Sequence, residues 1–131
     1  MASGARTRPL IAALGCLCLG APSALAHHSL APYDRNVSRT IEGVVKTYEF
    51  ANPHVKLSLL VANPDGSSTE WFFESGSIGR LRERGFNRVS ARAGERITVR
   101  YNPKRNGTAG GYFLAFTTED GHTYGPTTSR E

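Results

Sequence analysis

Five stretches of this chain have the apolar pattern and the residue types of β-strands, and the second of them alternates cleanly between apolar and polar residues. The five stretches are residues 39–50, 55–61, 69–74, 96–101 and 111–118. Turn-forming residues separate them, including Asn63-Pro64-Asp65-Gly66 between the second and the third. Asp120-Gly121 follows the fifth stretch and is a strong hairpin signal, so we expect residues 122–124 to pair back onto that strand.

The first stretch carries a further signal within it. Ile41 and Val45 mark one apolar face, with Tyr48 as a further candidate for that face. Gly43 lies between them, and glycine inside a strand is typical of a bulge or a tight bend. We therefore expect the first strand to bend near Gly43.

The segment between the third and fourth stretches breaks the alternation and predicts a short helix at residues 75–86. Ile78 and Leu81 lie three residues apart, which places them on one side of a helix. Either Ser75 or Ser77 can cap its first turn, because a serine hydroxyl accepts a hydrogen bond from an unpaired backbone N–H there.

The order of these elements is three strands, a helix and two strands. In a chain of this size, this order predicts a mostly β fold, either a small five-stranded OB-like barrel or an antiparallel sheet with one short helix between strands three and four. The domain organisation that we expect is a cleaved segment at 1–26, an extended arm at 27–38, the β-barrel-like domain at 39–125 and a loose tail at 126–131.

The first 26 residues have the three parts of a secretory signal peptide. Arg6 and Arg8 are positively charged, residues 10–19 are apolar, and Ala24-Leu25-Ala26 provides the small residues that signal peptidase prefers. The sequence therefore predicts export to the periplasm or beyond, with cleavage after Ala26. A retained anchor is the weaker alternative, since a bilayer-spanning helix needs about 20 apolar residues.

Removal of this segment changes the composition. Both cysteines, Cys16 and Cys18, leave with the signal, so the exported domain has no disulfide and must be held together by packing. The net charge of +5 falls to about +3, because Arg6 and Arg8 also leave. Such a mild charge, together with export, argues against a nucleic-acid partner. No membrane span is expected after cleavage.

The four histidines are the strongest candidates for chemistry, and they are His27, His28, His54 and His122. Cleavage after Ala26 would make His27 the first residue, where its free amine and ring Nδ1 can chelate one metal ion. One further imidazole would complete a three-nitrogen arrangement called a histidine brace, which suits copper. His54 is the best third ligand because the rigid Pro53 precedes it. His28 and His122 are further candidates.

A metal-free binding module is the alternative function. OB-type barrels often bind saccharides or oligonucleotides on the exposed face of strands two and three. Trp71 and Phe73 alternate with Phe72 along the third stretch, so one of these sets should face the core and the other can face a saccharide, peptide or protein partner. The residues do not decide whether the protein is an enzyme, and they favour a non-catalytic role, because no nucleophile has an evident base beside it.

The chain also resembles an uncharacterised bacterial family of small exported proteins, a domain of unknown function. The recurring pieces stand in family order here as Ala26-His27-His28-Ser29, Tyr33-Asp34, Gly43-Val44-Val45, Asn52-Pro53-His54, Glu70-Trp71 and Gly76-Ser77. One departure is Phe86, where the family pattern has Trp after Arg-Gly. The resemblance implies export and a small barrel-like domain, and it brings no known activity.

Overall fold

The computed structural model describes Met1 and residues 30–127 of the chain. Its elements in chain order are β1 Arg39–Glu49, β2 Lys56–Ala62, β3 Ser68–Glu74, α1 Ile78–Arg82, β4 Arg96–Pro103, β5 Gly110–Thr118 and β6 Thr123–Tyr124. Each lies within three residues of a predicted element at both ends, except α1, which is much shorter than residues 75–86. No helix among the described residues has the length and apolar character needed to cross a membrane.

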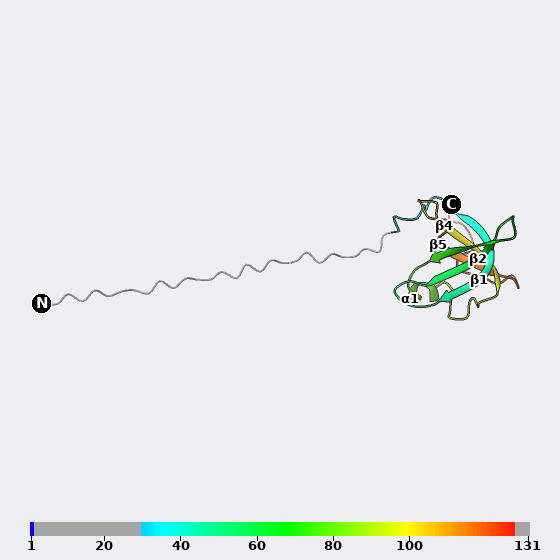
Figure 1. The fold of residues 1–131 in the computed structure, drawn as a ribbon. Coiled ribbons are helices and arrows are strands. Elements are labelled where there is room, and N and C mark those ends of the chain that lie inside the picture. The colour runs from blue at the N-terminus through cyan, green and yellow to red at the C-terminus, as the bar shows by residue number, and fades with distance from the viewer. Residues whose placement is uncertain (2–29, 128–131) are drawn as a thin grey trace.

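Five of the strands close into a barrel (Figure 1). β1 pairs in antiparallel fashion with β2 and β4, β2 pairs with β3, and β4 pairs with β5. A parallel pairing between β3 and β5 closes the ring, and β6 extends the sheet beyond β5. The order around the barrel is therefore β1-β2-β3-β5-β4, with α1 between β3 and β4, which is the OB type. The predicted five-stranded OB-like barrel is confirmed.

The closure of the barrel depends on Gly110 and Gly111, which lie opposite Phe72 and Phe73 in the parallel pairing. A Cβ at Gly110 would overlap the backbone oxygen of Phe72, and the positive φ of 133° at Gly110 is itself unfavourable for other residues. A Cβ at Gly111 would overlap the backbone oxygen of Asn102. Glycine is required here because three strands approach each other closely.

β1 bends after Val45 rather than at Gly43. The register with β2 shifts between Val45 and Thr47, which marks a bulge. A bulge reverses the alternation of the side chains, so Val45 and Tyr48 share the inner face although they are three positions apart, an odd number. Gly43 has a different function: a Cβ there would lie 2.9 Å from the Leu60 backbone oxygen on β2.

The core is aromatic and fills the barrel. Phe113, Phe116 and Phe86 are at most 2% exposed, and the Phe86 and Phe116 ring centroids are 5.3 Å apart. Leu81, 1% exposed, is the one buried residue of α1. Ser77 caps the helix, while Ser75 is buried and donates a hydrogen bond to the Phe113 backbone oxygen at 2.9 Å. The short helix thus places Leu81 in the core, and the half-buried Ile78 packs against the same core.

The segment before β1 packs onto the barrel. Tyr33 is 6% exposed and forms an isolated antiparallel bridge with Lys104, just after β4. The Asp34 backbone N–H donates to the Pro103 oxygen at 2.8 Å, and the Arg105 N–H donates to the Pro32 oxygen at 2.9 Å. The described part of the predicted arm is therefore anchored by backbone hydrogen bonds and by one buried tyrosine.

Candidate functional site

Three side chains from distant parts of the chain meet at the end of β3. The Tyr33 hydroxyl donates a hydrogen bond to Oε1 of Glu74 at 2.6 Å, and Nδ1 of His54 lies 3.4 Å from Oε2 of the same carboxylate. Tyr33 comes from the arm, His54 from the loop between β1 and β2, and Glu74 from the last position of β3. We call these three residues the Glu74 cluster.

The loop that carries His54 is attached to the segment between β3 and α1. The Val55 N–H donates to the Gly76 oxygen at 3.0 Å, and the Ser75 N–H donates to the Val55 oxygen at 2.9 Å. The Asn52 side-chain oxygen accepts a hydrogen bond from the Ile78 N–H at 3.1 Å, at the start of α1. The Asn52–Pro53 peptide bond is cis. These contacts hold His54 next to Glu74.

The cluster lies at the boundary between the core and solvent. The side chains of His54 and Glu74 are 26% and 37% exposed, whereas Tyr33 is buried. Burial, and then the hydrogen bond to Glu74, raise the pKa of Tyr33, so its hydroxyl stays protonated and remains the donor. When Nδ1 of His54 carries the ring proton, that nitrogen donates to Glu74 and the lone pair lies on Nε2. A carboxylate in this position fixes the orientation of an imidazole.

His122 lies on the turn between β5 and β6. Its ring packs edge-on against Tyr124, with 4.5 Å between the ring centroids, and its backbone oxygen accepts from the Thr118 N–H at 2.9 Å. Glu74 pairs with Tyr112 near the start of β5, whereas His122 follows the end of that strand. Because a strand rises about 3.3 Å per residue, Tyr112 and Thr118 are about 20 Å apart along β5.

The predicted metal ligands are therefore only partly described. His27 and His28 lie outside the described residues, as do the predicted cleavage site and residues 128–131 of the predicted tail. Within Met1 and residues 30–127, no three His, Cys, Asp or Glu side chains form a group that could hold a metal ion. The structure brings His54 next to Glu74 and leaves the four-histidine prediction untested.

The outer face of β2 and β3 carries one exposed aromatic residue. Phe72 is 56% exposed and borders a hollow of about 330 Å³, which Glu70, Lys104 and the Glu74 cluster residue Tyr33 also line. Phe73 is buried, and Trp71 packs against the core with its ring 6.3 Å from that of Phe73. The two sets of aromatic residues expected on β3 thus separate as the alternation predicts.

Sequence reasoning missed the roles of Tyr33 and Glu74 beside His54. Tyr33-Asp34 stands out in the sequence only as part of the family resemblance, and no pattern in the sequence singles out Glu74. Forty-one residues separate the tyrosine from the glutamate, so only the closure of the barrel brings the two together.

Comparison with known proteins bears on the family and gives no activity. Neither a curated protein nor a solved structure matches the chain. A family model described as "Family of unknown function (DUF6152)" matches residues 15–113. This agrees with the resemblance to an uncharacterised family, while the signal peptide and the role of the histidine motifs stay predictions. The match covers most of the chain, which therefore belongs to DUF6152, a family of unknown function.

Proposed function

We propose that this protein, once exported to the periplasm and cleaved after Ala26, binds copper or a similar late divalent metal ion. The ligands are imidazole nitrogens of His27, His28 and His54, together with the new terminal amine of His27. Imidazole and amine nitrogens in one plane suit copper. The role is binding or transport of the metal rather than catalysis.

One observation carries this proposal: Glu74 contacts both His54 and the arm that leads from the other two histidines. The carboxylate lies 3.4 Å from Nδ1 of His54 and accepts the Tyr33 hydroxyl at 2.6 Å. Metal-binding histidines commonly donate their second ring nitrogen to a carboxylate in this way. Glu74 therefore supports His54 as a ligand through Nε2.

Chain length is compatible with the proposal. Residues 30–33 form a turn in which the Tyr33 N–H donates to the Leu30 oxygen at 3.0 Å, so the chain that can extend begins at Leu30. Three residues separate Leu30 from His27 in numbering, and this stretch spans at most about 11 Å. The proposal requires it to run from Leu30 toward His54. His122 follows the opposite end of β5, so it is the least suited of the four as a shared ligand.

The experiment begins with mass spectrometry of the exported protein, which identifies its first residue. Copper and zinc are then titrated into the protein that begins at His27, beside His27→Ala, His54→Ala and Glu74→Gln. We expect copper affinity to fall at least tenfold in both histidine variants, and about tenfold in Glu74→Gln because the support of His54 is weakened.

Two controls make the titration specific. A protein that begins at His27 but carries an acetylated amino terminus keeps every histidine and has no free amine, so it should lose the chelate and bind copper weakly. His122→Ala should change copper affinity least. Equal, weak binding by all of these proteins, or a first residue other than His27, would contradict the proposal.

A second candidate is a metal-free binding module on the outer face of β2 and β3, for a saccharide, peptide or protein. The observation that favours it is Phe72, which is 56% exposed beside a hollow. An exposed ring in this position can stack on a sugar or on an aromatic side chain. The neighbouring Trp71 is the only tryptophan of the chain, so its fluorescence reports on ligands here.

This second candidate is tested by fluorescence titration with neutral oligosaccharides and unstructured peptides. Phe72→Ala should abolish any binding, whereas Val89→Ala removes an exposed apolar side chain outside β2 and β3 and should leave binding unchanged. Equal binding by the wild type and Phe72→Ala would rule out a role for this face.

A further inference from the structure

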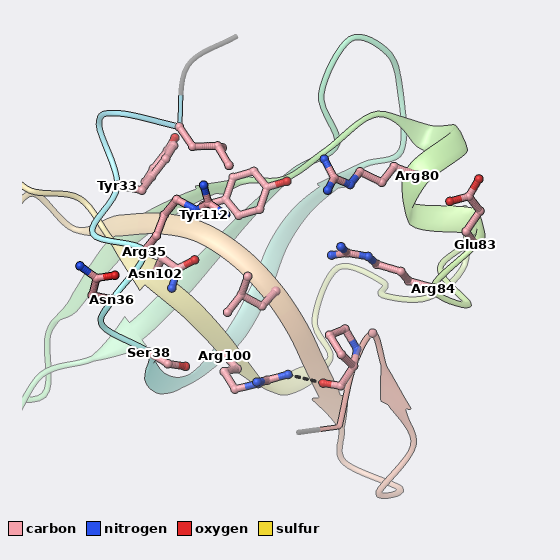
Figure 2. A pocket seen from close by; sticks show the side chains of 14 residues that line it. Tyr33, Arg35, Asn36, Ser38, Arg80, Glu83, Arg84, Arg100, Asn102 and Tyr112 are labelled. Carbon is pink, nitrogen blue, oxygen red and sulfur yellow. Dashed lines mark hydrogen bonds between the residues drawn. The ribbon is translucent and has the colours of Figure 1, made fainter. Parts of the chain in front are cut away.

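A second concave region lies on the other side of Tyr33 from the Glu74 cluster. It has a volume of about 740 Å³, within the range of small-molecule sites. Its walls come from the arm, from α1 and the turn after it, from β4 and β5, and from the chain after β6 (Figure 2). We call it the arginine cavity, because Arg35, Arg80, Arg84 and Arg100 line it.

The four arginines come from three different walls. Arg35 belongs to the arm, Arg80 and Arg84 belong to α1 and its following turn, and Arg100 belongs to β4. Figure 2 shows Arg80 and Arg84 extending toward Tyr112, while Arg100 points to Pro126, whose backbone oxygen accepts its hydrogen bond. The positive charges therefore surround a shared space and do not form a stripe on an open surface.

The charges of this cavity are not balanced by the protein residues that the structure describes. None of its four arginines forms an ion pair with a described carboxylate, although three other arginines of the described residues do, namely Arg92, Arg96 and Arg105. Glu83 is the one acidic residue in the lining, and Figure 2 shows it pointing away from Arg80 and Arg84. Like charges that share a concave wall repel one another, and an anion between them removes that repulsion.

The rest of the lining can hold an organic anion. Tyr112 is buried, with its hydroxyl close to Gly76: a Cβ built there would lie 3.5 Å from that oxygen and 3.2 Å from Cδ of Arg80. Leu30 and Leu114 add apolar contact area. A hydroxyl donor, apolar walls and several guanidinium groups together favour a small molecule over a bare monovalent ion.

The chain after β6 helps to close the cavity. The Gly125 N–H donates to the Arg84 oxygen at 3.2 Å, which joins this segment to the turn after α1. A Cβ at Gly125 would lie 2.6 Å from the Leu114 backbone oxygen, so only glycine fits here without a shift. This contact holds the wall that carries Arg84 against the wall that carries Arg100.

We propose that the arginine cavity binds a small molecule that carries two or more oxyanion groups, either carboxylates or phosphates. Guanidinium groups bind both chemistries through paired N–H donors, and four of them match a ligand with more than one negative group. This site is separate from the proposed metal site and does not depend on it.

The test is isothermal titration calorimetry of metal-free protein with two probes, citrate and inorganic pyrophosphate, at low ionic strength. We expect at least one probe to bind with a dissociation constant of about 10⁻⁴ M or tighter. Binding of citrate alone, of pyrophosphate alone or of both identifies the preferred oxyanion. Failure of both probes to bind would overturn the proposal.

Matched variants separate this site from a general effect of charge. Arg80→Gln/Arg84→Gln should weaken binding at least tenfold. Arg82→Gln/Arg88→Gln removes the same number of charges from residues that do not line the cavity, and it should leave binding unchanged. Arg35→Gln tests the opposite wall and should also weaken binding. Equal losses in the two double variants would show nonspecific attraction and contradict the proposal.

Discussion

Tyr33 belongs to the Glu74 cluster and also lines the arginine cavity. The two regions differ in whether the described residues balance their charges. In the cluster, one carboxylate is matched by a tyrosine hydroxyl at 2.6 Å and by an imidazole at 3.4 Å. In the cavity, four arginines share a space without a described carboxylate partner. A carboxylate that is hydrogen-bonded within the fold supports the fold, whereas several like charges around a concave site attract an anion from outside.

Tyr33→Ala should produce the largest effect, because it disrupts both regions. Tyr33 is 6% exposed, its ring lies 5.7 Å from that of Tyr112, and its hydroxyl anchors the arm to Glu74. Loss of a buried aromatic side chain typically costs about 3–5 kcal/mol. Urea denaturation should show this loss, and Tyr33→Phe should lose only about 1 kcal/mol. Equal losses for the two variants would mean that the ring does not pack as described.

Glu74→Ala should have the next largest effect. It leaves the buried Tyr33 hydroxyl without its acceptor, which costs about 1–2 kcal/mol in unfolding free energy. Because Glu74→Gln keeps an acceptor oxygen, it should lose less in the same denaturation experiment. If Glu74→Ala were as stable as the wild type, the cluster would not stabilise the arm.

A smaller effect is expected from alkaline pH. Burial and the hydrogen bond to Glu74 raise the pKa of Tyr33 above its ordinary value of 10.0. The unfolded chain therefore releases this proton at lower pH than the folded chain does, so stability is full below about pH 10 and falls as the pH rises above it. Tyr33→Phe should fall less steeply. Burial also raises the pKa of Tyr48 and Tyr101, so part of the slope remains in that variant.

The smallest effect is expected in the arginine cavity. Arg80→Gln/Arg84→Gln should change the free energy of unfolding by no more than about 0.5 kcal/mol, because these side chains support no ion pair within the described fold. The change should favour the variant at low salt and disappear as salt screens the repulsion. A loss comparable to that of Glu74→Ala would show that these arginines are structural, and the contrast between the two regions would fail.

The elements of the fold were largely predictable because each depends on local sequence. Alternation placed the strands, and the turn signal at Asp120-Gly121 predicted the pairing of β6 with β5. The predicted helix was too long: α1 begins at Ile78, after Ser77 caps it, and ends at Arg82, well before Gly85. The bend expected near Gly43 lies after Val45, where the register with β2 shifts. The odd spacing of the apolar residues Val45 and Tyr48 is the feature of the sequence that indicates this position.

By itself, the sequence determined the order of the elements along the chain, the single helix, the family resemblance and the short list of histidines. Only the tertiary structure decided that Tyr33 and His54 meet at Glu74, and that Arg35, Arg80, Arg84 and Arg100 line one space. The physical reason is the closure of the barrel. Alternation and turn chemistry act over a few residues, whereas these contacts form only when β3 pairs with β5 and the arm packs beside β4.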